Sequence, residues 1–198
     1  MIGEIIGWMK LYVDYRTVGR IIDGEKSRGT FPRSLAIVAI AQGIVFFSIA
    51  ASYMIANLIA PSGENLLQTF GGLLLLNLLG FTLFYLTSFI MFLIARALGG
   101  KGSLDAQIHL LAIFALCNNI VTVPFITLAS LPVVGPFLYL AAIVVGLYSI
   151  YAQFLAVRSL HGFSNLRAAL VLALTLVVFV LFTSVLNVLI ARIAGIAI

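Results

Sequence analysis

Long apolar stretches separated by short polar ones dominate the sequence from residue 34 onward. A helix needs about 20 predominantly apolar residues to cross the hydrocarbon core of a bilayer. Five stretches reach that length, at residues 34–60, 66–95, 106–131, 135–157 and 166–191. Strands of a membrane barrel have about ten residues and alternate apolar with polar positions, which these runs do not. The pattern predicts an all-α membrane protein with a bundle of five transmembrane helices.

The first 33 residues have a different pattern, with charges throughout and no continuous apolar core. Apolar residues recur there at helical spacing, at positions 2, 5, 6, 9, 12 and 13, which predicts an amphipathic helix. Candidate contacts with the membrane surface lie in or just after this stripe: Trp8, Lys10, Arg16 and Arg20. Such a helix either lies in the headgroup layer or docks on the bundle, and the sequence leaves both interpretations open.

The arm and the spans give the expected organisation of the chain. Residues 1–33 form an N-terminal arm, in which residues 23–29 are predicted to be a polar linker. Thr30, Phe31 and Pro32 are typical of the cap and first turn of a helix. Residues 34–198 form the five-helix domain, with a tight turn between spans three and four at residues 130–136. No cleavable signal peptide is recognised, so the first span is expected to direct membrane insertion.

Composition supports the membrane assignment. The chain is 63% hydrophobic and only 9% charged, whereas about a quarter of the residues of a soluble domain are charged. The net charge of +5 is no sign of a nucleic-acid partner, because the basic residues lie at the ends of the apolar stretches.

The positions of the basic residues predict the orientation. Ten of the eleven Lys and Arg residues lie in the arm or in the loops after spans two and four, and only Arg192 follows the last span. Positive residues are retained on the cytoplasmic side. The N-terminus is therefore expected inside and the C-terminus outside the cell membrane.

Candidate chemistry is sparse. No ionisable residue lies at the centre of a span, where proton- or ion-coupled carriers usually keep one. His109 and His161 are separated by more than a span and are expected to be partly solvated at the cytoplasmic interface. The single cysteine, Cys117, excludes an intramolecular disulfide and any multi-cysteine site. We expect no catalytic residues, no metal and no cofactor, and hence no enzyme.

Span three is the most irregular, because Asn118, Asn119 and Thr122 precede Pro124, which should kink the helix. Amides in lipid need partners, and Tyr148, Tyr151 and Gln153 of span four are candidates for one shared polar site. Further candidate partners are Asn77, Tyr85 and Asn187. Two interpretations stay open: hydrogen bonds that join the helices, or a small cavity for a ligand or lipid headgroup.

Several short motifs resemble those of the Yip1-domain family and cover about residues 10–190. They are the loop Leu98-Gly99-Gly100-Lys101-Gly102-Ser103, the proline-bearing third span, Tyr148-Ser149-Ile150-Tyr151, and the segment from Leu160 to Ala169. The segment from Tyr15 to Ile22 is similar to the family's lead-in to span one.

The resemblance implies five spans with a cytoplasmic N-terminus. It also implies, for eukaryotic members, a role in Golgi and ER trafficking through prenylated Rab GTPases and other family members. This chain has no long N-terminal domain, and Ala115-Leu116-Cys117-Asn118 replaces the family's Tyr-Gly pair. Both differences weaken the expectation of GTPase binding, and the compact loops are typical of a prokaryotic member.

The expected function is a non-enzymatic membrane scaffold or adaptor. Its expected partners are membrane lipids and other membrane proteins, or a second copy of the chain. The alternatives are a small permease or channel that uses the polar third span, and an accessory subunit of a larger membrane complex.

Overall fold

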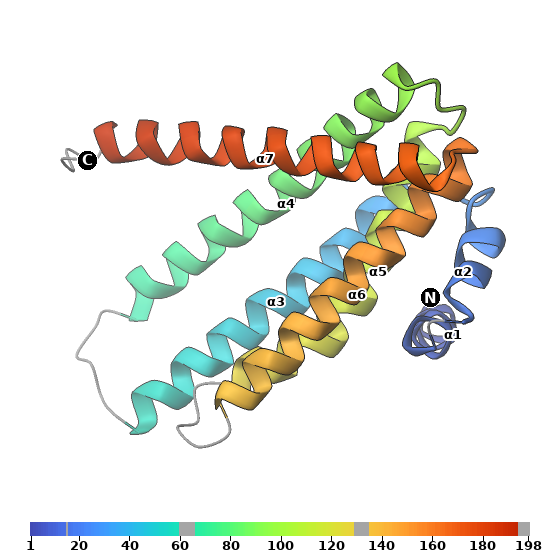
Figure 1. Cartoon of the computed structure of the whole chain (residues 1–198). Helices are drawn as coiled ribbons and strands as arrows, with labels where there is room; N and C mark the ends of the chain where they lie inside the picture. Colours follow the sequence, from blue (N-terminus) through green and yellow to red (C-terminus); the bar gives the residue numbers. More distant parts are fainter. Residues whose placement is uncertain (15, 60–65, 129–134, 194–198) are drawn as a thin grey trace.

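The computed structural model describes residues 1–14, 16–59, 66–128 and 135–193, with the side chains of 55–59, 66–68 and 187–193 left aside. The described residues form seven α-helices (Figure 1). They are α1 (Ile2–Val13), α2 (Val18–Glu25), α3 (Phe31–Ile59), α4 (Leu66–Ala97), α5 (Leu104–Leu128), α6 (Gly135–His161) and α7 (Asn165–Ile193).

Helices α3 to α7 are long and apolar enough to cross a membrane. The prediction of an all-α, multi-pass membrane protein with five transmembrane helices is therefore confirmed. The helix ends agree with the predicted spans to within a few residues, and α3 begins at Phe31 as the predicted cap requires. The predicted turn between spans three and four falls largely on residues 129–134, outside the described residues.

Helix α5 is the centre of the bundle, and it packs mainly against α3 and α6. Its side chains from Ala106 to Phe114 are all buried, including the polar Gln107 and His109. A helix that is apolar around its whole circumference is typical of such a central position. Pro124 lies inside α5, and the helix continues to Leu128.

Helices α4 and α7 diverge from this group. Figure 1 shows α7 crossing α4 and running away from α3, α5 and α6 toward the C-terminus. Only 11% of the most apolar segment of α7 is buried inside the protein, whereas 44% of the corresponding segment of α5 is buried. Most of α7 is therefore left for lipid or for partner proteins to cover.

The arm differs from its prediction in one respect, because it contains a second helix. Val18, Ile21 and Ile22 are buried, and the same helical stripe continues to Glu25. Residues 23–25, predicted to begin a polar linker, therefore belong to α2. The linker prediction is wrong for residues 23–25 alone, because a charged residue occupies the last position of an otherwise apolar stripe, and residues 26–29 connect α2 to α3.

Helices α1 and α2 lie against one end of the bundle, which we call the arm end (Figure 1). The α4–α5 and α6–α7 connections meet at this end, since backbone N–H of Lys101 donates to the carbonyl of His161. Gly99 and Gly162, both at positive φ, end α4 and α6. In each case the following residue donates its N–H to a carbonyl five positions back, as in a Schellman cap.

Candidate functional site

The most connected charged residue at the arm end is Glu25, whose side chain is buried. The Trp8 indole donates to Oε1 at 3.2 Å, and His109 Nε2 lies 3.1 Å from Oε2. The Arg33 guanidinium lies 3.3 Å from Oε2 and 2.8 Å from Glu4 Oε1. We call these five residues the Glu25 cluster: Glu4, Trp8, Glu25, Arg33 and His109. They join α1, α2, α3 and α5.

The geometry of the cluster fixes the role of each group. An ionised carboxylate only accepts hydrogen bonds, so His109 Nε2 carries the proton and donates it to Glu25. Arg33 also lies over the Trp8 ring, 5.9 Å from its centroid. His109 Nδ1 is buried and has no hydrogen-bond partner among the described residues. A buried carboxylate is stable here because neighbouring donors and a cation replace its water.

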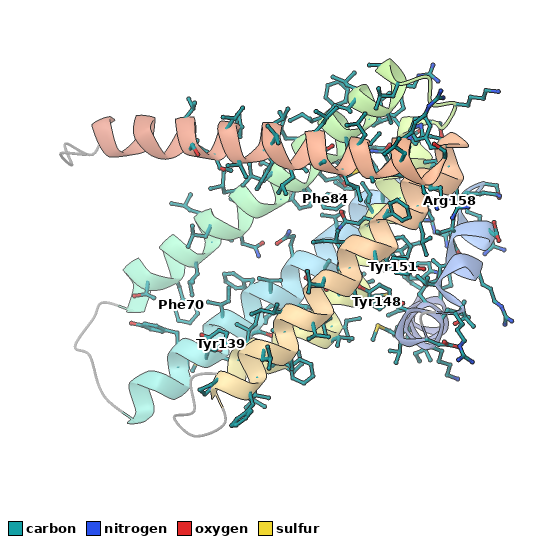
Figure 2. All side chains as sticks on the ribbon, in the orientation of Figure 1. Phe70, Phe84, Tyr139, Tyr148, Tyr151 and Arg158 are labelled. Atoms are coloured by element: carbon teal, nitrogen blue, oxygen red, sulfur yellow. The ribbon has the colours of Figure 1, made fainter. Side chains whose placement is uncertain are left out.

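The arm docks on the bundle through aromatic side chains as well. Tyr12 is 1% exposed, and its ring lies 6.1 Å from Phe114 and 5.0 Å from Tyr148, centroid to centroid. The Tyr148 hydroxyl donates to the Tyr12 carbonyl, and Figure 2 shows Tyr148 on the side of α6 near α1. Burial raises the pKa of Tyr12 to about 12, so its hydroxyl stays neutral at physiological pH. The structure thus shows α1 docked.

The four candidate membrane-surface residues differ in their exposure. Trp8 is only 4% exposed and faces Glu25, whereas Lys10, Arg16 and Arg20 are exposed. A separate face of α1 remains uncovered by the rest of the chain, with Ile2 at 77%, Ile6 at 52% and Val13 at 70% exposure. Docking on the bundle and contact with lipid therefore use different faces of α1, and the two interpretations are compatible.

A series of hydrogen bonds between polar groups joins the α4–α5 and α6–α7 connections at the arm end. Backbone N–H of Gly102 donates to His161 Nδ1 at 3.3 Å, which leaves the proton of a neutral imidazole on Nε2. His161 Nε2 then donates to Gln107 Oε1 at 2.8 Å, and Gln107 Nε2 donates to the Ser88 carbonyl at 2.9 Å. These hydrogen bonds link the α4–α5 loop to α6, α5 and α4.

Gly100 and Gly102 of this loop are required because the loop packs closely against His161 and Leu160. A Cβ on Gly100 would clash with the His161 ring and lie 2.8 Å from the Ala95 carbonyl oxygen. A Cβ on Gly102 would lie 2.6 Å from Leu160 Cγ. Both positions therefore exclude any larger side chain unless the loop moves.

The residues predicted to form one polar site around span three lie in different places. Asn119 donates to the Ala41 carbonyl of α3 at 3.2 Å, and Asn118 accepts from Thr122 on its own helix at 3.4 Å. Tyr148 contacts α1, and the Tyr151 ring lies 6.4 Å from that of Tyr148. Gln153 lines a cavity between α4, α6 and α7 instead. Thus these side chains do not converge on a single cavity.

The family model named Yip1 domain matches residues 17–186, and thus includes α2 to α6 and most of α7. The chain belongs to the Yip1 domain family. No curated protein and no solved structure matched the chain. The resemblance predicted from the short motifs is thereby confirmed.

In this Yip1 domain, the loop Gly99-Gly100-Lys101-Gly102 has a structural explanation. Gly99 ends α4 with φ +86°, Gly100 and Gly102 make room for His161 and Leu160, and Ser103 Oγ accepts from the Ala106 N–H as a helix cap. Lys101 is exposed. In the described part of the chain, no cluster of three or more His, Cys, Asp or Glu could hold a metal ion.

Sequence reasoning missed the residues that tie the arm end together. His109 and His161, predicted to be partly solvated, are 0% and 2% exposed. Glu25 and Gln107 were not candidates at all. The apolar stripe of Val18, Ile21 and Ile22 did carry a signal for Glu25, since position 25 lies on the same helical face.

Replacing Asn119 with Leu is expected to cost about 1 kcal/mol of stability, the scale of an interhelical hydrogen bond in membranes. The bond to Ala41 would be lost, whereas Asn118→Leu removes only a contact within α5 and should cost less. Unfolding in detergent by denaturant titration measures both. A permeation path would give another result: Asn119→Leu would leave stability unchanged and abolish solute flux into proteoliposomes.

Proposed function

We propose that this Yip1 domain is a non-enzymatic scaffold or adaptor of the cell membrane, and that its arm end is the surface it presents to partners in the cytoplasm. The observation that carries this proposal is the Glu25 cluster. It fixes α1 and α2 on the bundle through a buried carboxylate with partners from three other helices. A surface held in one conformation loses little entropy when a partner binds it.

The charge of this surface indicates the chemistry of the partners. Its cations are exposed on the arm and on both connections: Lys10, Arg16, Arg20, Lys26, Arg28, Arg96, Lys101, Arg158 and Arg167. Retention of positive charge on the inner side of a membrane supports a cytoplasmic arm end. Acidic protein surfaces and anionic headgroups are the complementary partners.

The polar groups inside the bundle favour a scaffold over a permease. Asn119 and Asn77 donate to carbonyls of α3, at 3.2 and 2.8 Å, and Tyr148 donates to α1. Side chains engaged in this way join helices and are not free to replace the water around a solute.

Reversing three charges of the arm, by Lys10→Glu, Arg16→Glu and Arg20→Glu together, is expected to remove most acidic partners that co-purify with the full chain in native nanodiscs. The matched control is Lys10→Arg, Arg16→Lys and Arg20→Lys, which keeps the charge and should keep the partners. Quantitative mass spectrometry of the bound proteins and lipids measures the difference.

Retention of one fixed set of membrane proteins by both variants would favour an accessory subunit and contradict the adaptor proposal.

The orientation is checked in the same membranes with a single cysteine at position 101 and Cys117 replaced by Ala. Labelling of that cysteine from outside the cell would overturn the cytoplasmic assignment.

A further inference from the structure

Two adjoining cavities lie where α7 crosses α4, next to α6. One has a volume of about 260 Å³ and the other about 320 Å³, and they share Thr87, Met91, Gln153 and Phe179 in their walls. We call the two together the α4–α6–α7 groove. Figure 2 shows Phe84, which lines the first cavity, near the place where α7 crosses α4. The groove is distinct from the Glu25 cluster and goes beyond the proposed scaffold role.

The walls are apolar except for a few groups, and two of these have no hydrogen-bond partner in the described part of the chain. The Gln153 amide and the Thr87 hydroxyl make no hydrogen bond to any residue that the structure describes. The neighbouring hydroxyls behave differently, since Ser88 and Thr175 donate to carbonyls one turn back at 2.8 and 2.7 Å. An apolar groove with a few polar groups that converge in it is typical of a binding site for an amphiphile.

The rim of the groove opens toward lipid. Ile150 is 54% exposed and Leu176 62% exposed, and both line the second cavity. Nothing in the described chain covers this opening, because α7 diverges from the bundle beyond the crossing (Figure 1). A lipid chain can therefore enter laterally from the bilayer.

The depth of the groove selects the part of a lipid that meets Gln153. Along α6, Gln153 lies about 27 Å from the far end of the helix at Gly135, at 1.5 Å per residue. Tyr148, five residues before Gln153, bonds to α1, which carries exposed charges and so lies at the membrane surface. Gln153 is therefore at the level where the hydrocarbon core meets the headgroups. At that level a lipid chain is joined to its glycerol through an oxygen atom, which can accept a hydrogen bond from the amide.

We propose that the α4–α6–α7 groove binds one chain of a membrane glycerolipid, and that Gln153 donates a hydrogen bond to the oxygen that joins this chain to the glycerol. Thr87 is the second polar contact. The bound lipid also fills the space between α7 and the rest of the bundle.

The test uses the full chain in nanodiscs that contain a small fraction of phosphatidylcholine with a photoactivatable diazirine in one acyl chain. Mass spectrometry then maps the crosslinked residues. Wild-type protein is expected to be labelled in the groove, at residues such as Leu176 and Phe179, well above the outer face of α3 at Phe47. Replacing Gln153 with Leu should lower groove labelling about fivefold, which corresponds to the loss of one hydrogen bond.

The matched control is Gln42→Leu, the same change at a glutamine of α3 that lines a different cavity, between α3 and α4. This variant should leave groove labelling unchanged. A second variant, Ala173→Phe, fills the groove from α7 and should also reduce labelling. Equal labelling of the groove and of Phe47, unaffected by either groove variant, would overturn the proposal. Protein–protein crosslinks through an unlabelled groove would overturn it as well, because another helix would then be the occupant.

Discussion

Replacing Glu25 with Ala is expected to detach the arm from the bundle and to destabilise the docked state by about 3 kcal/mol, the lower end of the cost of breaking a buried ion pair. The variant leaves Trp8 and His109 without an acceptor and Arg33 with Glu4 as its remaining anion. The contribution of Arg28 is small, because its side chain is 59% exposed. The loss therefore falls on the contacts between α1, α2 and α5.

Tryptophan fluorescence measures this detachment directly, because Trp8 is the single tryptophan of the chain and is buried beside Glu25. Its fluorescence emission should move to longer wavelength in Glu25→Ala, and limited proteolysis should cut within the first 30 residues. Asp23→Ala is the matched control, since that carboxylate is on the same helix and 73% exposed. Unchanged emission and protease protection in Glu25→Ala would show that the aromatic contacts of Tyr12 hold the arm without the cluster.

The five spans could be predicted because their physical signal is local. Twenty or more apolar residues in a row satisfy the bilayer requirement whatever their neighbours are. The hydrogen bond of Asn119 illustrates the limit of such reasoning. The sequence predicts a partner on a neighbouring span, and the amide indeed reaches the backbone carbonyl of Ala41 on α3, but the sequence could not name this carbonyl. Every residue has such an acceptor, so no sequence pattern marks the one that is used.

The arm shows a second limit. The apolar positions of α1 predict an amphipathic helix, but they do not say which of two apolar faces meets the bundle. Trp8 and Tyr12 lie on the docked face and Ile2 and Ile6 on the other, and only the packing distinguishes them. Glu25 and His109 are 84 positions apart, so their contact depends on the tertiary arrangement and has no local signature.

The sequence pattern predicts a loop after span two and the resemblance singles out its glycines, but the physical reason for these glycines lies in another segment. Nothing near residue 100 indicates a need for glycine at that position beyond the end of a helix. The requirement comes from His161, whose ring occupies the space of the missing side chain. The two segments thus constrain each other across the arm end.

This constraint makes Gly100→Ala the second variant with a large expected effect, a loss of about 2–3 kcal/mol from overpacking and one broken hydrogen bond. The new methyl group would clash with the His161 ring and press on the Ala95 carbonyl. The backbone cannot relax freely, because the Gly100 N–H is bonded to that same carbonyl at 2.9 Å. Movement of the ring would also break the bond from Gly102 and loosen Gln107.

Thermal unfolding of the full chain in mild detergent measures this loss. Gly146→Ala is the matched control within the bundle, because a Cβ on Gly146 would meet nothing within 4 Å. A double-mutant cycle assigns the cause: His161→Ala removes the clashing ring, so the Gly100→Ala, His161→Ala double variant should cost less than the sum of the two single changes. If the two costs simply add, or if Gly100→Ala unfolds at the temperature of Gly146→Ala, the packing of the loop against His161 does not stabilise the arm end.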